Sequence, residues 1–323
     1  MTLTLPKISI IMPVLNRKTM IARAIQSVLK QQYPNIELIV LDGGSTDGTV
    51  DVIEQYQQHI AYWHSQPDGC CTESINAGIE KASGDLIVIL MSDDWFEAGL
   101  FFKIAKAYQT HDVDILVCGG RRIAYQPASE HYVEQINFMS TRKQTFTLFN
   151  TCLNAYFAIC CCFIKPSVFK RIGLFMPYLN GQVFVANDRE WVIRAALYPV
   201  SSYVVPFLGY TYCAHDGSIS FGNNARNIIR ISEEHQWIAQ HFLANKQLSR
   251  AQRATLLCWR YEQLAYLFYL YLLQKEWRNS MAAMRQGFKD SVLLWTSIFT
   301  FVTVRALVRK CWRWLAGSPV LSI

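Results

Sequence analysis

The sequence predicts an α/β protein with a mainly parallel sheet flanked by helices and a helical C-terminal region. Over the first hundred residues, short apolar runs alternate with segments of helical periodicity. This alternation is typical of parallel strands joined by crossover helices. After Asn223 the sequence shows helical periodicity only. At 323 residues, 51% of them hydrophobic, the chain is long enough to bury a domain core and to carry an appendage.

The first hundred residues supply the expected sheet. The expected strands are Ile8–Val14, Ile36–Leu41, Ile60–His64 and Leu86–Met91. A first helix is expected between the first two strands, ending near Gln32, and two further helices are expected over Val50–Tyr56 and Ser74–Lys81. Polar residues follow every strand, and sheets of this type bind ligands beyond the carboxyl ends of their strands. We therefore expect the functional site at this edge.

Further along the chain the pattern is less regular. Strand-like runs at Ile115–Ile123, Phe157–Ile164 and Ser202–Tyr212, with a helix over Arg189–Leu197, predict an extension of the sheet that forms a wall for a second substrate. The helical region that follows contains two apolar stretches, Leu264–Leu273 and Val292–Val304.

The cysteines and the N-terminus indicate an intracellular protein. The ten cysteines include neighbours in sequence and show no Cys-x-x-Cys spacing, so we interpret them as reduced thiols that pack as small hydrophobes. No basic segment followed by an apolar core opens the chain, so we expect no signal peptide.

Two adjacent carboxylates follow the fourth expected strand, in Ser92-Asp93-Asp94-Trp95. Neighbouring carboxylates repel each other unless a cation or hydrogen-bond donors meet them. A divalent cation that bridges a diphosphate explains the pair, because Mg²⁺ binds one or two carboxylates together with phosphate oxygens. The alternative is a helix N-cap formed by Ser92 or Asp93.

A glycine-rich turn, Asp42-Gly43-Gly44-Ser45-Thr46-Asp47-Gly48-Thr49, follows the second expected strand. It lacks the Gly-x-Gly-x-x-Gly spacing of dinucleotide-binding folds and the lysine of a P-loop, which argues against a dehydrogenase or an ATPase. Its polar side chains also suit a simple helix cap.

Four segments in order resemble the signatures of family 2 glycosyltransferases with the GT-A fold. They are Ile8–Asn16, Val40–Thr49, Asn76–Asp85 and Ser92–Trp95. The resemblance covers about residues 7–220. Tyr62–Asp68 is similar to a segment of family members that build bacterial surface polysaccharides, whereas Gly69–Glu73 departs from the usual continuation.

The resemblance implies roles for the residues at the strand ends. Pro13, Val14 and Asn16 would border the nucleotide pocket, Asp42 would meet the base, and Asp68 would lie near the donor. In the carboxylate pair, Asp93 would contact the ribose, and Asp94 would bind Mg²⁺ or Mn²⁺.

Asp188, in Asn187-Asp188-Arg189-Glu190-Trp191, matches the catalytic base of the family. Inversion requires a base that removes the proton of the acceptor hydroxyl. Glu190 is the competing carboxylate, but two residues along a helix it points about 160° away. Asp188 could instead cap the helix. His215 is a second candidate metal ligand or a diphosphate contact, with an ordinary loop histidine as the alternative.

Together these features predict an inverting glycosyltransferase of polysaccharide biosynthesis that uses a nucleotide sugar, with UDP as the default nucleotide. The expected domains are a catalytic domain over 1–222, divided into a nucleotide-sugar half (1–113) and an acceptor half (114–222), and a helical region over 223–323. The alternative is a nucleotide-sugar-binding module of the same fold without turnover. A nucleotidyltransferase is disfavoured because no basic glycine-rich signature follows the first strand.

The C-terminal region predicts attachment to the inner face of the cell membrane. From Lys246 onward, 12 Lys and Arg residues stand against 3 Asp and Glu residues, although the whole chain carries only +7. The uncharged run at 291–304 is shorter than the roughly 20 residues needed to span a bilayer. Arg305, Arg309 and Arg313 share one helical face, which suits anionic headgroups. Ordinary packing on the catalytic domain is the alternative.

Overall fold

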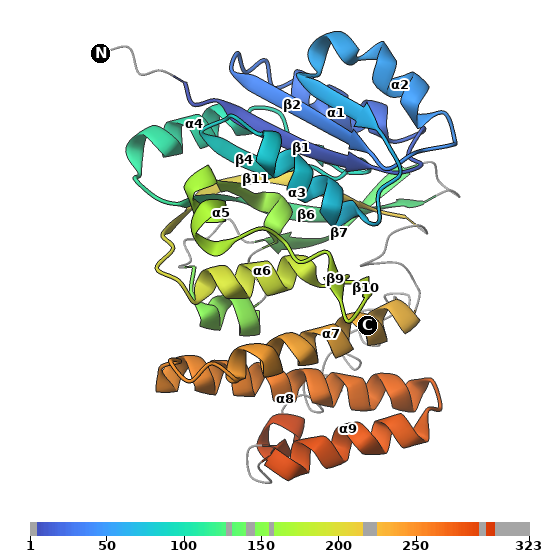
Figure 1. Cartoon of the computed structure of the whole chain (residues 1–323), viewed down its shortest axis with the longest axis vertical. Helices are drawn as coiled ribbons and strands as arrows, with labels where there is room; N and C mark the ends of the chain where they lie inside the picture. Colours follow the sequence, from blue (N-terminus) through green and yellow to red (C-terminus); the bar gives the residue numbers. More distant parts are fainter. Residues whose placement is uncertain are drawn as a thin grey trace. The chain divides into compact units, whose positions relative to one another are not determined.

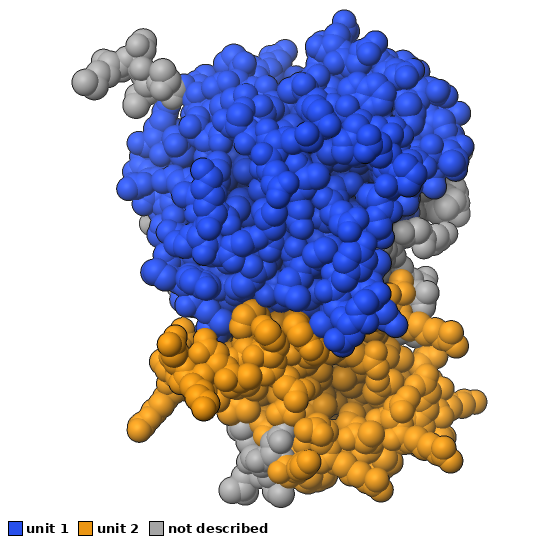
Figure 2. All heavy atoms as spheres, viewed as in Figure 1, with its two compact units in different colours: residues 1–215 blue, residues 216–323 orange. Residues whose placement is uncertain are grey.

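The computed structural model describes residues 5–126, 131–139, 146–154, 158–215, 225–290 and 295–300. Within it the chain forms two compact units, residues 1–215 and 216–323 (Figure 2). The predicted boundary between residues 222 and 223 lies outside the described residues and stays a prediction.

Unit 1 is built around one curled sheet with helices on its faces (Figure 1). The strand order is β3-β2-β1-β4-β8-β6-β11-β5, with β7 paired to β6. The strands are β1 (Ile8–Val14), β2 (Ile36–Asp42), β3 (Tyr62–Ser65), β4 (Leu86–Ile89), β5 (Trp95–Phe96), β6 (Ile115–Gln126), β7 (His131–Met139), β8 (Cys162–Ile164) and β11 (Ser202–Ala214), and a separate hairpin joins β9 (Tyr178–Leu179) to β10 (Gln182–Val183).

The helices of unit 1 connect these strands. They are α1 (Ile21–Leu29), α2 (Thr49–Gln55), α3 (Cys71–Lys81), α4 (Leu100–Thr110), α5 (Pro166–Ile172) and α6 (Asn187–Ala196). Three shorter helical segments are η1 (Gln57–His59), η2 (Asn150–Asn154) and η3 (Ile159–Cys161). In α1, buried apolar residues recur three or four positions apart, so one face of the helix packs on the sheet. Gly78 lets α3 approach the sheet closely, because a Cβ at this position would lie 2.4 Å from the Ile11 side chain.

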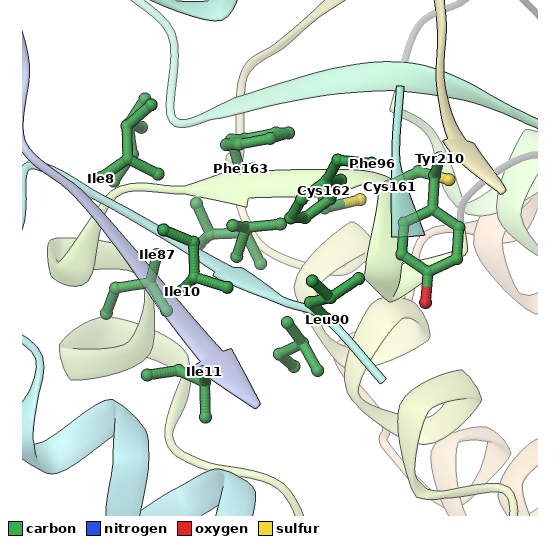
Figure 3. Packing of buried hydrophobic residues seen from close by; sticks show 14 of the residues in the cluster. Ile8, Ile10, Ile11, Ile87, Leu90, Phe96, Cys161, Cys162, Phe163 and Tyr210 are labelled. Carbon is green, nitrogen blue, oxygen red and sulfur yellow. The ribbon is translucent and has the colours of Figure 1, made fainter. Parts of the chain in front are cut away.

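The core of unit 1 fills the space around β1, β4 and β8 (Figure 3). Ile8, Ile10 and Ile11 in β1 are fully buried, as the continuous apolar run of a strand covered on both faces requires. The rings of Phe96 in β5 and Tyr210 in β11 meet edge to face at 5.8 Å, so the core extends to the strand that directly follows the acidic pair.

The structure confirms the predicted fold class. β1 to β4 and their connecting helices follow the predicted order, and β1, β2, β3 and β4 are parallel. The predicted halves 1–113 and 114–222 share one sheet, because β4 pairs with β8 and β5 pairs with β11. The predicted strand over Phe157–Ile164 is shorter than expected, since Ile159–Cys161 forms a 3₁₀ turn before β8.

Unit 2 contains the antiparallel helices α7 (Ala225–Leu243), α8 (Arg250–Leu273) and α9 (Trp277–Asp290) (Figure 1). Ser249 and Gln252 form a capping box that starts α8. Within the apolar stretch Leu264–Leu273, Leu264, Leu267 and Leu270 pack in this unit's core with Trp295. In the part of the chain that the structure describes, no helix has both the length and the apolarity to cross a bilayer.

Candidate active site

Three parallel strands end in register at one edge of the sheet. Val14 in β1 pairs with Asp42 in β2, and Asp42 pairs with Ser65 in β3. The loops that follow these strands therefore emerge side by side, where sheets of this type bind ligands.

Asp42 is fully buried, and its side chain accepts hydrogen bonds from the loop that follows it. Its carboxylate accepts the backbone N–H groups of Gly44 and Ser45 at 3.1 and 2.9 Å. The hydroxyls of Ser45 and Ser65 donate to it at 2.5 and 2.6 Å. Three of these donors meet Oδ2 and one meets Oδ1. Because Asp42 is also 0% exposed, it organises the glycine-rich turn and presents no oxygen to solvent.

The end of β1 is joined to this turn through Asn16. Its N–H donates to Ser45 Oγ at 2.7 Å, and its side-chain oxygen accepts the Thr46 N–H at 2.9 Å. Asn16 is exposed, whereas Pro13 and Val14 are buried in the strand. Pro13, Val14 and Asn16 are predicted to border the nucleotide pocket. Of these three residues, only Asn16 presents its side chain to solvent.

The carboxylate of Asp68 stands where a side chain at position 43 would project. A Cβ added at Gly43 would lie 2.8 Å from Asp68 Oδ1 and 3.0 Å from Oδ2. The hydroxyl of Ser74 donates to Asp68 Oδ2 at 2.5 Å and fixes the carboxylate. Asp68 is only partly buried, so the absence of a side chain at Gly43 lets an acid from the next loop occupy the strand end.

Asp93 contacts two cationic or ionisable side chains from other loops. Its Oδ2 lies 2.9 Å from His215 Nε2 and 3.4 Å from Arg17 Nε. The side chains of Asp93 and His215 are 17% and 16% exposed. The end of β11 thus brings His215 to the acidic pair from 122 residues away in sequence.

Asp94 lies in a different environment from its neighbour. It is 1% exposed, Tyr210 donates its hydroxyl to Oδ2, and the Cys213 N–H donates to Oδ1 at 2.8 Å. Burial, and then the negative charge of Asp93, raises the pKa of Asp94 well above its usual range. Both oxygens therefore face the protein interior, and this geometry favours Asp93 over Asp94 as a cation ligand.

Asp93 and His215 fit a divalent cation as a pair. Ligands at about 2.1 Å in adjacent positions of an octahedral shell lie about 3.0 Å apart, which matches the 2.9 Å between Asp93 Oδ2 and His215 Nε2. Among the described residues, no group of three or more Asp, Glu, His and Cys side chains forms a preorganised cage. Such a cation would depend on ligand oxygens or water for the rest of its shell.

Asp188 and Glu190 are separated by their surroundings. Asp188, in the first turn of α6, is exposed, and its Oδ1 accepts the Arg189 N–H at 2.7 Å. Glu190 is 2% exposed and forms two hydrogen bonds with Arg194, at 3.0 and 2.9 Å. Arg194 also donates to the carbonyls of Ile172 and Leu174. Glu190 is therefore a structural residue, whereas Asp188 remains accessible to a substrate.

The segment before α6 is tied to the start of α3. Asn76 forms two hydrogen bonds with the backbone of Phe175, at 2.8 and 3.0 Å. Glu73 accepts the Gly69 N–H at 2.9 Å, and its hydrogen bond with Tyr178 raises the pKa of the tyrosine to about 12. The loop Gly69–Glu73 thus contacts the chain that leads to Asp188.

Three residues at the site were not predicted from sequence: Arg17, Arg23 and Tyr210. Arg17 pairs with Asp93, and Arg23 donates to the Asp93 carbonyl at 2.9 Å with its guanidinium 4.0 Å from the Trp95 ring centre. Arg17 directly follows Asn16 at a predicted strand end, and this position is a usable signal. Arg23 and Tyr210 lie inside a helix and a strand, where no local pattern marks them.

Residues 9–173 match the model of a protein family described as glycosyl transferase family 2. The chain is 32% identical over 172 residues to an uncharacterised glycosyltransferase of Rickettsia typhi, covering 53% of this chain and 54% of the relative. It is 28% identical over 113 residues to the glycosyltransferase GlyG of Streptococcus pneumoniae, covering 34% of this chain and 38% of the relative. The chain spans about half the length, or less, of these curated relatives.

Two of the solved structures that match the chain illustrate the shared fold. TarS 1–349 of S. aureus, in complex with UDP-GlcNAc, superposes with a TM-score of 0.65 at 20% identity and covers 86% of this chain and 79% of its own. The mannosyltransferase PcManGT of Pyrobaculum calidifontis, in complex with GDP-Man and Mn²⁺, gives a TM-score of 0.58 at 15% identity and covers 94% and 81%.

Proposed function

The chain belongs to glycosyltransferase family 2, and from this premise we propose that it transfers a sugar, with inversion, from a nucleoside diphosphate sugar to a hydroxyl of a glycan or lipid-linked acceptor in polysaccharide biosynthesis. The observation that carries the proposal is the grouping of Asp93, His215 and Arg17. A carboxylate and an imidazole suit a divalent cation, and a guanidinium suits diphosphate oxygens.

Asp93 and His215 are the proposed ligands of Mg²⁺ or Mn²⁺, in place of Asp94. When bound, such a cation supplies positive charge that stabilises the departing diphosphate. Arg17 adds a second positive charge at the same place. Asp94 holds the strand ends together through Tyr210 and Cys213 and thereby positions Asp93.

Asp188 is the proposed general base. Its exposed carboxylate takes the proton of the acceptor hydroxyl while that oxygen forms its bond to the anomeric carbon. The bond between this carbon and the diphosphate oxygen breaks, and the diphosphate leaves with the electron pair. Glu190 is unsuited to this role because it is buried in its pair with Arg194.

Asp68 is the proposed contact to the nucleotide base, in place of Asp42. A carboxylate only accepts hydrogen bonds, and Ser74 already occupies one Asp68 oxygen. The remaining oxygen suits a single ring N–H donor such as uracil N3–H, which supports UDP as the nucleotide. Asp42 contributes indirectly, because it shapes the turn beneath the base.

A nucleotide-sugar-binding module without turnover is the alternative function. The feature behind it is the altered loop Gly69–Glu73, which is closed by its own contacts with Glu73 and Tyr178. Asp188 favours the enzyme, because it is exposed on a helix whose neighbouring carboxylate is structural.

Cytoplasmic localisation, with attachment to the inner face of the membrane, is part of the proposal. The charge of the C-terminal region supports it. Arg305, Arg309 and Arg313, on which the sequence prediction relies, lie outside the described residues. In the described part of the run 291–304, Trp295 packs in the core of unit 2.

The test is a calorimetric binding panel of UDP, GDP, CDP and dTDP sugars with Mn²⁺ and with EDTA. We expect one UDP sugar to bind in Mn²⁺, with affinity reduced at least tenfold by EDTA. If no nucleotide sugar binds under either condition, both the enzyme and the binding-module proposals fail.

A further inference from the structure

Helix α9 exposes an apolar strip on its outer surface. Trp277, Met281 and Phe288 are 63%, 46% and 40% exposed. Leu273, the last residue of α8 at the same end of α9, is 65% exposed. Large apolar side chains exposed together mark an interaction site more often than scattered ones do.

The three strip residues lie on one face of the helix. At about 100° per residue, Trp277, Met281 and Phe288 fall within an arc of about 40°. The buried residues Ser280, Ala283 and Gly287 lie about 100° to one side, where α9 packs in unit 2. The strip is therefore not the packing face of α9.

Three exposed cations lie on the other side of the strip. Arg278, Arg285 and Lys289 are all exposed and occupy an arc about 80° to 120° from Trp277. An apolar strip edged by Lys and Arg, with a tryptophan at its end, is the pattern of a helix that lies in the plane of a membrane surface.

We propose that the α9 face, made of Trp277, Met281 and Phe288 with Arg278, Arg285 and Lys289, docks on an anionic lipid bilayer. The charge of the region complements such a surface, because 12 Lys and Arg residues stand against 3 Asp and Glu residues from Lys246 onward. The apolar strip enters the boundary between headgroups and acyl chains, while the cations contact the headgroups.

Two other occupants fit the face less well. A second copy of the chain would place these cations close to their own equivalents, and like charges oppose association. A nucleic acid would satisfy the cations but would leave the apolar strip without a partner of its own kind. An anionic bilayer meets both halves of the face.

The helix lies on the membrane and does not cross it. α9 has 14 residues and is about 21 Å long, shorter than the hydrocarbon core of about 30 Å. The inference rests on the membrane attachment in the proposed function and assigns it to a defined face of unit 2. It would bring an acceptor on a lipid carrier to the same surface as the enzyme.

The test is sedimentation of the full chain with phosphatidylcholine vesicles, with and without phosphatidylglycerol, in the absence of nucleotide sugar. The apolar variant carries Trp277→Ser, Met281→Ser and Phe288→Ser. The charge variant carries Arg278→Glu, Arg285→Glu and Lys289→Glu. A control with the same change in charge carries Lys103→Glu, Lys106→Glu and Lys170→Glu, three exposed cations of unit 1.

We expect the wild type and the control to sediment with the anionic vesicles. Little of either protein should sediment with the neutral vesicles. The charge variant should bind at least 10²-fold more weakly, since each cation near an anionic leaflet contributes about fivefold, and the apolar variant should also lose binding. Circular dichroism checks that both variants keep their helices.

The proposal is overturned if the wild type ignores anionic vesicles or if both α9 variants bind as the wild type does. It is also overturned if light scattering shows that the apolar variant converts a dimer to a monomer without changing vesicle binding, because the strip would then cover a second copy. Donor turnover is measured separately, so failure of the proposed enzyme activity leaves this result readable.

Discussion

Asp93 and Asp94 are neighbours in sequence, but their carboxylates face different surroundings. Asp93 lies between Arg17 and His215 near the surface, whereas Asp94 is buried against Tyr210 and the backbone of Cys213. The family resemblance assigns the ribose to Asp93 and the cation to Asp94. The structure separates a carboxylate suited to a cation from one that holds the strand ends together.

The first prediction concerns this pair. The ratio of donor affinity in Mn²⁺ to donor affinity in EDTA should fall at least tenfold in Asp93→Asn, because an amide lacks the charge that holds the cation. Asp94→Asn should lower the free energy of unfolding by about 1–3 kcal/mol, because a buried hydrogen-bonded acid is lost, while the Mn²⁺ response persists. Calorimetry and urea unfolding measure the two effects. If Asp94→Asn removes the Mn²⁺ response and Asp93→Asn retains it, Asp94 is the metal ligand.

Asp68 provides a prediction about base selection. Asp68→Asn turns an acceptor into a side chain that can also donate, so affinity for UDP should fall about tenfold and affinity for CDP should rise. Competition binding of UDP and CDP measures the ratio. Asn16→Ala, which also alters the loop, serves as a control that should weaken both nucleotides equally. An unchanged ratio in Asp68→Asn would place the base elsewhere.

Glu190 should matter for stability more than for chemistry. Removing one partner of a buried ion pair costs about 3–5 kcal/mol, so Glu190→Gln should destabilise the protein by an amount on that order. Asp188→Asn is the matched control, because Asp188 is exposed and its replacement should leave stability nearly unchanged. Equal melting temperatures for Glu190→Gln and the wild type would contradict the structural role of Glu190.

Glu37 predicts a specific dependence of stability on pH. Burial alone would raise the pKa of this carboxyl, but hydrogen bonds from Lys7, Ser83 and Ser9 lower it to about 2, against an ordinary 4.5. Because the folded-state pKa lies below the unfolded one, the stabilisation is present above about pH 4.5 and disappears as the pH falls towards 2.

Glu37→Gln should therefore cost about 1–2 kcal/mol near pH 7, after allowance for screening by solvent. The difference from the wild type should shrink steadily below pH 4.5. Urea unfolding at several pH values measures it. A difference that does not vary with pH would show that Glu37 stabilises the fold through packing and not through its charge.

The fold of the first hundred residues could be predicted because its signals are local. The apolar runs of β1, β2 and β4 are long enough to mark buried strands, and their polar ends mark the ligand edge. The two-residue strand β5 is too short to carry a periodicity. Its pairing with β11 depends on contacts made more than a hundred residues later.

The candidate site shows the same division between local and distant information. The positions of Asp188 and His215 follow from motifs beside a helix start and a strand end. The proposed exchange of roles between Asp93 and Asp94 rests on Tyr210, which reaches Asp94 from 116 residues away. The role of Asp68 depends on the space above Gly43, and this space exists only after β2 and β3 have paired.

The most direct test of the proposed function is the release of nucleoside diphosphate from UDP sugars in the presence of Mn²⁺, with extracted glycan or lipid-linked acceptors. The proposed function predicts acceptor-dependent release by the wild-type chain. It also predicts a rate at least 10²-fold lower for Asp188→Asn, with donor affinity unchanged. Tight donor binding by the wild type without any turnover, or full turnover by Asp188→Asn, would contradict it.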